Sequence, residues 1–105
     1  MQVLFDQGTP VPLRRYLISH TVVTVFEKGW SSMPNGDLLD IAEVEGFDGL
    51  VTTDQSLKYQ QNLANRRIAL VVLTTTNWAI IERSVKLVTD AIDGMKPGAY
   101  VEIAF

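Results

Sequence analysis

Hydrophobic residues occur along the chain in short runs separated by polar segments. Val3–Phe5, Thr21–Phe26 and Ile68–Leu73 are rich in apolar or β-branched residues and predict strands. The last run is uninterrupted, as expected for a strand that is covered on both faces. Leu50–Thr53 predicts a further strand, and Tyr100–Phe105 is expected to close the sheet as an edge strand.

The segments between these strands carry helix signals. A short helix is expected from Pro10 or Val11 to Ile18, another from the N-cap Asn35 to Gly46, and a polar one over Ser56–Asn65. The longest helix begins at the N-cap Asn77, and its apolar positions recur at steps of three and four: Trp78, Ile81, Val85, Val88, Ile92 and Met95. Alternating strands and helices predict an α/β fold with a mainly parallel sheet wrapped by helices.

Length and composition indicate one globular domain over residues 1–105. The chain has 105 residues, 47% of them hydrophobic and 20% charged, which is enough apolar material for a core. The absence of cysteine excludes disulfides and thiolate metal sites. The first residues lack the basic region of a signal peptide, and the longest apolar run is far below the roughly 20 residues of a membrane span. We therefore expect a soluble, cytoplasmic protein with no membrane partner.

The distribution of charge is more informative than its sum. The formal net charge of −3 argues mildly against a non-specific nucleic-acid coat. Basic residues nevertheless pair at Arg14–Arg15 and Arg66–Arg67, and Lys58 and Tyr59 lie between these pairs in a polar helical turn. These six residues are candidates for binding an anionic substrate, although a solvated surface is the ordinary role of such residues.

Two aspartates follow predicted strands. Asp6 follows the first strand and Asp54 the third, and in parallel sheets the ligand site lies beyond the carboxyl ends of the strands. Asp37, in the first turn of the second helix, could face the same crevice. Carboxylates held close together repel one another unless a cation such as Mg²⁺ or Mn²⁺ compensates. A bound ion of this kind can activate water and promote phosphoryl displacement.

Each of these acids also has a purely structural interpretation. Asp6 could form a turn, Asp54 could cap the following helix, and Asp37 complements the helix dipole. Other chemistry has less support, because the sequence contains no nucleophile elbow and no glycine-rich phosphate loop. The single histidine, His20, is expected to be a surface or cap residue, and both tryptophans are expected to pack in or beside the core.

The chain resembles a known family over successive blocks from Val3 to about Tyr100. These blocks include Val-Leu-Phe-Asp-Gln-Gly-Thr-Pro, Asn35-Gly36-Asp37-Leu38-Leu39, Gly46-Phe47-Asp48 and Thr52-Thr53-Asp54-Gln55 through Leu63. They are similar to the PIN-domain-like predicted nucleases of bacterial toxin–antitoxin systems, distant relatives of VapC-type toxins. The resemblance implies a three-layer α/β/α fold and Mg²⁺- or Mn²⁺-dependent cleavage of RNA, restrained by a cognate antitoxin. A homodimer is a further assembly compatible with this resemblance.

The resemblance matches Asp6 to the acid after the first strand and Asp54 to the acid of a Thr-x-Asp motif. Asp37, two residues beyond the position of the family's second acid, completes the candidate catalytic and metal-binding residues. The family often has an aspartate where this chain has Asn35, and another acid where this chain has Ser56. Asn35 and Ser56 are therefore further candidate ligands. These two substitutions also favour an alternative, a catalytically degenerate module that binds RNA or an antitoxin.

A third class, a phosphoacceptor receiver domain, fits less well. It requires paired acids after the first strand and a lysine after the fifth strand. In this chain Gln7 follows Asp6, and Lys96 precedes the last strand.

Overall fold

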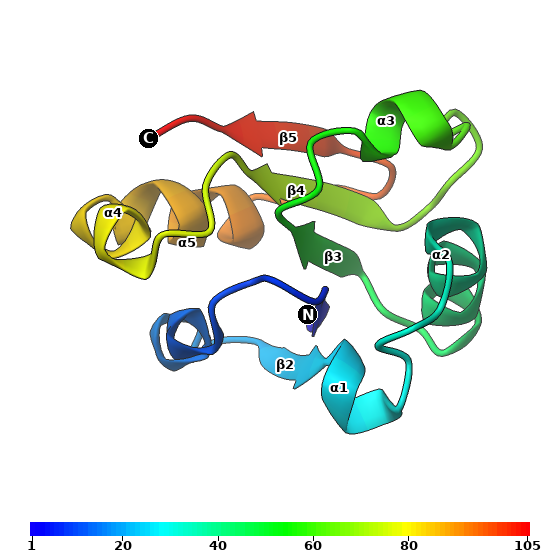
Figure 1. Ribbon diagram of the computed structural model, residues 1–105, viewed down its shortest axis with the longest axis horizontal. Helices are drawn as coiled ribbons and strands as arrows, with labels where there is room; N and C mark the ends of the chain where they lie inside the picture. Colours follow the sequence, from blue (N-terminus) through cyan, green and yellow to red (C-terminus); the bar gives the residue numbers. More distant parts are fainter.

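The computed structural model describes residues 1–105, and it has a five-stranded sheet between two layers of helices (Figure 1). Every strand pairing is parallel, and the strand order is β2-β1-β3-β4-β5. The three-layer α/β/α fold with a parallel central sheet is therefore confirmed. The strands are β1 (Gln2–Phe5), β2 (Thr21–Thr24), β3 (Gly49–Thr52), β4 (Ala69–Leu73) and β5 (Tyr100–Ile103).

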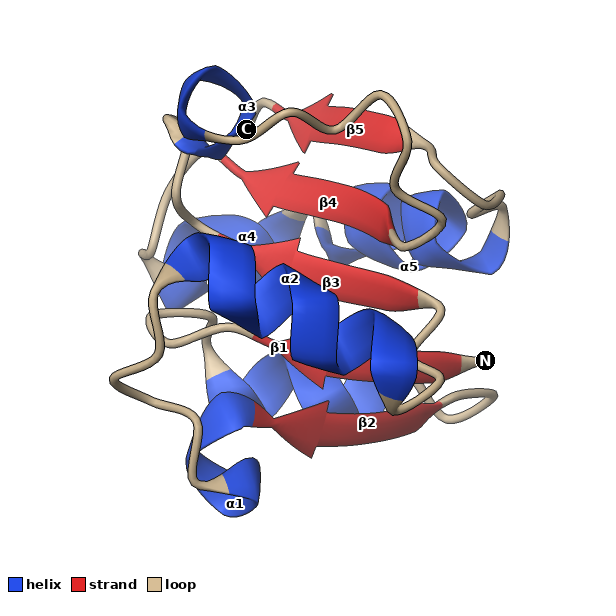
Figure 2. Ribbon diagram, turned by 90° about the vertical axis from the view of Figure 1, so that its right-hand side faces the viewer, coloured by secondary structure: helices blue, strands red, loops and turns tan.

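Alternation of side chains along the strands builds two hydrophobic cores. Val3 and Phe5 point to one face of β1, where they pack with η1 (Val11–Tyr16), α4 (Trp78–Arg83) and α5 (Val85–Asp93). Leu4 points to the other face, which is covered by α1 (Val25–Lys28), α2 (Asn35–Val44) and α3 (Leu57–Gln60). Figure 2 shows α2 in front of the sheet and α4 and α5 behind it.

The strand order creates a switch point between β1 and β3. The chain leaves β1 toward β2 on one side, and then returns to place β3 on the other side of β1. This order is that of flavodoxin-like sheets, in which ligands bind beyond the carboxyl ends of the strands at the switch point. Asp6 and Asp54 follow the two strands that flank it.

The β4–β5 connection crosses on an unusual face. The β2–β3 and β3–β4 connections run in the same direction along the sheet, and their helices pack with Leu50 and Leu70. The β4–β5 connection also runs in that direction, but α4 and α5 pack against Val71 on the opposite face (Figure 2). About 98% of parallel crossovers are right-handed, and this arrangement makes the β4–β5 crossover left-handed. On the face that carries α1 and α2, only the short α3 covers β5.

Two predicted elements differ from the observed ones because local hydrogen bonds redirect the backbone. The strand expected over Thr21–Phe26 ends at Thr24, where a capping box with Glu27 starts α1. The helix expected from Asn77 to Met95 breaks at Ser84 into α4 and α5. Its predicted start is confirmed, because the Asn77 side chain accepts a hydrogen bond from the Ile80 N–H. Its apolar positions also lie in or against the core, as expected.

Three further helix predictions need correction. The first helix is a 3₁₀ helix over Val11–Tyr16, with proline in its first turn. The polar helix expected over Ser56–Asn65 is only one turn, and beyond it the Asn62 side chain accepts a hydrogen bond from the Ala64 N–H in a local turn. Asn35 is the first residue of α2 and does not cap it, because Pro34 holds the N-cap position. No helix has the length and apolar character needed to cross a membrane.

Candidate functional site

Asp6 and Asp54 lie on either side of one threonine at the carboxyl ends of β1 and β3. The Thr52 hydroxyl donates a hydrogen bond to Asp6 Oδ2 at 2.8 Å, and Thr52 Oγ1 accepts one from the Asp54 N–H at 3.1 Å. Thr52 is fully buried in the last position of β3, so it fixes both acids to the sheet. The structure therefore brings together the two acids that follow strands in the sequence.

Asp6 is half-buried, and its ionisation is disfavoured. Burial raises the pKa of Asp6, and the nearby charge of Asp54 raises it further. Hydrogen bonds from the Thr52 hydroxyl and from the Gln7 N–H, at 2.8 Å to Oδ1, lower the pKa but do not cancel the effect of burial. The pKa of Asp6 therefore lies above its ordinary value.

Asp54 is the more readily ionised of the two. Its Oδ1 accepts hydrogen bonds from the Ser56 hydroxyl at 2.6 Å and the Ser56 N–H at 2.9 Å, and its Oδ2 accepts one from Asn35 Nδ2 at 3.2 Å. These bonds, led by that of the Ser56 hydroxyl, outweigh burial and lower the pKa of Asp54. Asp54 also shapes the turn into α3, which is the structural role that its sequence context allows.

An amide network connects the start of α2 to α3 around Asp54. Asn35 Nδ2 also donates to Gln60 Oε1 at 3.2 Å, and Gln60 Nε2 donates to Ser56 Oγ at 2.9 Å. Asp37, two residues after Asn35, is exposed and makes no side-chain hydrogen bond or ion pair. Asn35 and Ser56 thus join Asp54 directly, whereas Asp37 does not.

The carboxylate oxygens of Asp6 and Asp54 are the candidate ligands for a hard divalent cation. No group of three or more acidic or histidine side chains is close enough together to form a metal cluster. Asp6 has one hydrogen bond to each carboxylate oxygen and therefore one remaining lone pair on each. Asp54 keeps one on Oδ2, and Asn35 Oδ1 accepts no hydrogen bond within the chain. The remaining lone pairs of the two carboxylates suit an ion such as Mg²⁺ or Mn²⁺ that retains several water ligands.

Asp6 also lines an open pocket of about 570 Å³ between η1 and α1. Arg14, from η1, contributes to its wall and forms two hydrogen bonds with Glu27 of α1, at 2.7 and 3.3 Å. The neighbouring Arg15 is exposed and forms no ion pair. Among the six candidate substrate-binding residues, Arg14 is therefore the one that shares a pocket with Asp6.

Lys58 and Tyr59 lie on α3, which follows Asp54. Lys58 Nζ forms an ion pair with Glu102 of β5 at 2.9 Å and lies 5.1 Å from the centre of the Tyr59 ring. Tyr59 is 81% exposed. Both residues are near the carboxyl ends of the strands, but the positive charge of Lys58 is directed toward β5.

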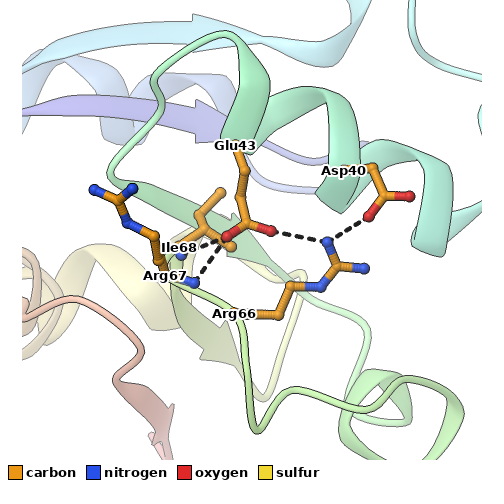
Figure 3. Close-up of polar contacts among 5 residues, drawn as sticks. All are labelled: Asp40, Glu43, Arg66, Arg67 and Ile68. Atoms are coloured by element: carbon orange, nitrogen blue, oxygen red, sulfur yellow. Dashed lines mark hydrogen bonds and ion pairs between the residues drawn. The ribbon is translucent and has the colours of Figure 1, made fainter.

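Arg66 and Arg67 directly precede β4, so they lie at the amino-terminal ends of the strands, opposite to Asp6 and Asp54. Figure 3 shows their contacts with α2. The Arg66 guanidinium bonds to Asp40 and Glu43 of α2, and Glu43 also accepts a hydrogen bond from the Arg67 N–H at 2.8 Å. Burial raises the pKa of Glu43, but the bonds from Arg66 and from the backbone outweigh it, so this pKa is lowered. These arginines brace α2 against β4, away from Asp6 and Asp54, and their role in substrate binding stays a prediction.

His20 differs from its predicted surface role. Its side chain is only 6% exposed, and its Nε2 lies 2.7 Å from Asp93 Oδ1 at the end of α5. The tryptophans pack as expected: Trp30 meets Phe47 edge-on and Trp78 packs beside Tyr16.

Sequence reasoning did not identify four residues that shape this region: Phe26, Glu27, Thr52 and Gln60. For Glu27 a signal was present, because Thr24-x-x-Glu27 is the pattern of a capping box. Thr52 precedes Thr53 and Asp54 at the end of β3. Its burial follows from the register of the sheet, which the sequence does not show. Phe26 reads as part of a strand, and only the helix start at Val25 turns it outward.

Comparison of the chain with models of protein families, with curated proteins and with solved structures found no match.

Proposed function

We propose that the chain is a metal-dependent ribonuclease, the toxin of a toxin–antitoxin pair, with its centre at Asp6 and Asp54. The observation that carries the proposal is the placement of these two carboxylates around Thr52 at the switch point of a parallel sheet. The resemblance of the surrounding sequence blocks to PIN-domain-like nucleases supports the same chemistry. It also supplies the antitoxin as the expected protein partner.

In this proposal Asp6 and Asp54 hold a Mg²⁺ or Mn²⁺ ion through their remaining lone pairs. Thr52 positions Asp6 by donating to Oδ2, and Ser56 positions Asp54 by bonding to Oδ1. Asn35 positions the other side of Asp54, because its amide N–H donates to Oδ2. When bound, the ion supplies Lewis-acid stabilisation of the phosphate and lowers the pKa of a bound water.

One observation favours the alternative, a degenerate module that binds RNA or an antitoxin without cutting. The Asn35 amide donates to Asp54 Oδ2, where an aspartate in the family would add a third negative charge. Because this amide already stabilises the Asp54 carboxylate, the site depends less on a cation than a three-acid site does.

The test is Mn²⁺ titration by calorimetry together with cleavage of a labelled RNA. The native chain should bind Mn²⁺ and cut the RNA only when Mn²⁺ is present, and Asp6→Asn should lose both properties. Asp90→Asn, which removes an exposed acid of α5 that pairs with Lys86, is the matched control and should retain both. RNA binding without Mn²⁺-dependent cleavage would select the degenerate module. A chain that binds neither Mn²⁺ nor RNA would exclude the ribonuclease and an RNA-binding module.

A further inference from the structure

We propose that the pocket between η1 and α1 binds an unstacked base of single-stranded RNA against Phe26. This inference rests on the proposed function, because it assigns the pocket to the nucleotide that adjoins the site at Asp6. The pocket is shared with that site through Asp6 itself, which is one of its lining residues. A base bound there would belong to the nucleotide whose phosphate is closest to the two carboxylates.

The dimensions of the pocket suit one nucleotide. Its volume of about 570 Å³ lies within the range of roughly 300–1,000 Å³ typical of small-molecule sites. It is open to solvent at the carboxyl ends of β1 and β2, so an extended strand can pass along it. The fully buried Phe5 and Val25 form its apolar floor.

Phe26 gives this pocket an exposed aromatic wall. Its side chain is 81% exposed, and Val11, also in the lining, is 55% exposed. The helix that carries Phe26 is firmly anchored: Thr24 and Glu27 form a capping box, and Gly29 ends the turn with a positive φ of 75°. A solvent-exposed aromatic ring on an anchored helical turn is the kind of side chain on which proteins stack unpaired bases.

The polar groups of the pocket favour a stacked base over a ligand that is held by its negative charge alone. The charged residues in the lining are Asp6, Arg14 and Glu27, so the pocket has no excess of positive charge. Arg14 is held in place by Glu27, and its Nε is buried with no hydrogen-bond partner within the chain. Stacking, more than phosphate neutralisation, must then supply the affinity, which excludes a duplex whose bases are already stacked.

The test measures binding separately from cleavage. The probe is a fluorescein-labelled single-stranded RNA octamer of mixed sequence, titrated by anisotropy in Ca²⁺, which takes the same oxygen ligands as Mn²⁺. Phe26→Ala should weaken binding by about 5- to 150-fold, the loss expected for one stacked base. Phe26→Trp should bind as tightly as the native chain. Val44→Ala, which trims an equally exposed apolar residue on α2, is the control and should change nothing.

Three results would overturn this assignment: equal affinity of Phe26→Ala and the native chain, equal affinity for a duplex of the same sequence, or no binding of the octamer by the native chain. None of them decides the proposed function, which depends on Mn²⁺ binding and on the effect of Asp6→Asn. If Asp6→Asn abolishes cleavage while Phe26→Ala binds normally, the metal site stands and the base subsite does not. Because Phe26 is exposed, its variants should keep the native melting temperature, and circular dichroism verifies this.

Discussion

Asp54→Ala and Asp6→Asn should change stability in opposite directions, although the two carboxylates are neighbours. The pKa of Asp54 is lowered in the folded chain, so its charged form stabilises the fold above its ordinary pKa, and this contribution is lost as the pH falls through the folded value. The pKa of Asp6 is raised. Its contribution to stability is therefore complete only below its ordinary pKa and is lost as the pH rises through the folded value.

The loss of stability expected for Asp54→Ala follows from the three hydrogen bonds that Asp54 accepts. Alanine removes both bonds from Ser56 and one of the two acceptors of the Asn35 amide, which is comparable to the loss of a helix cap. We expect a loss of about 1–2 kcal/mol. In a domain of this size 1 kcal/mol corresponds to roughly 4–8 °C in melting temperature. Asp6→Asn keeps an oxygen that can accept one bond and removes the buried charge, so stability at pH 7 should stay unchanged or rise by up to about 1 kcal/mol.

Thermal unfolding followed by circular dichroism at pH 7 and at pH 4 measures both effects in metal-free buffer. The stabilities of Asp6→Asn and the native chain should converge as the pH falls, because the native Asp6 then becomes protonated. Asp90→Asn serves as the surface control and should shift the melting temperature little. A fall in melting temperature for Asp6→Asn as large as that for Asp54→Ala would refute the reasoning and make Asp6 a turn-forming residue.

Three further predictions concern the metal and the core. Asn35→Asp should tighten Mn²⁺ binding in calorimetry and Asp37→Asn should leave it unchanged, because only Asn35 adjoins Asp54; a loss of affinity in Asp37→Asn would make Asp37 a ligand. Mn²⁺ affinity should fall as the pH drops through the raised pKa of Asp6, since protons then compete for that carboxylate, and a flat pH profile would contradict this. Ile81→Ala should lower the free energy of unfolding by about 2–4 kcal/mol in urea titrations, because the side chain is fully buried; a change below 1 kcal/mol would contradict its core position.

The sequence predicts the strands and the core well because both depend on simple patterns. Apolar runs locate all five strands, and the repeat from Trp78 to Met95 identifies the residues that pack on the sheet. The break at Ser84 leaves no trace in this pattern, because the step from Ile81 to Val85 preserves the helical periodicity across it. The face used by the β4–β5 connection is likewise invisible, since the same apolar repeat would pack on either side.

The candidate site is predictable only in part. Strand ends locate Asp6 and Asp54, because parallel strands bring their carboxyl ends to one edge. The contribution of Asn35 depends on the direction of its side chain, and the pattern that suggests a cap could not reveal a bond to Asp54. Arg66 could not be placed from the sequence, because a basic residue alone does not reveal its ion-pair partners. In the structure these partners are Asp40 and Glu43.

The left-handed β4–β5 crossover has a consequence for local unfolding. With α4 and α5 on the far face, α3 is a single turn that buries only Leu57 and is joined to β5 by the Lys58–Glu102 pair. So small a buried area opens at much lower free energy than the central strands. In native-state hydrogen exchange, the amides of residues 59–61 should exchange through local opening, whereas those of β3 and β4 should exchange only with global unfolding. Each opening would interrupt the bonds of Gln60 to Asn35 and Ser56, so the hydrogen-bond network around Asp54 would re-form each time α3 closes.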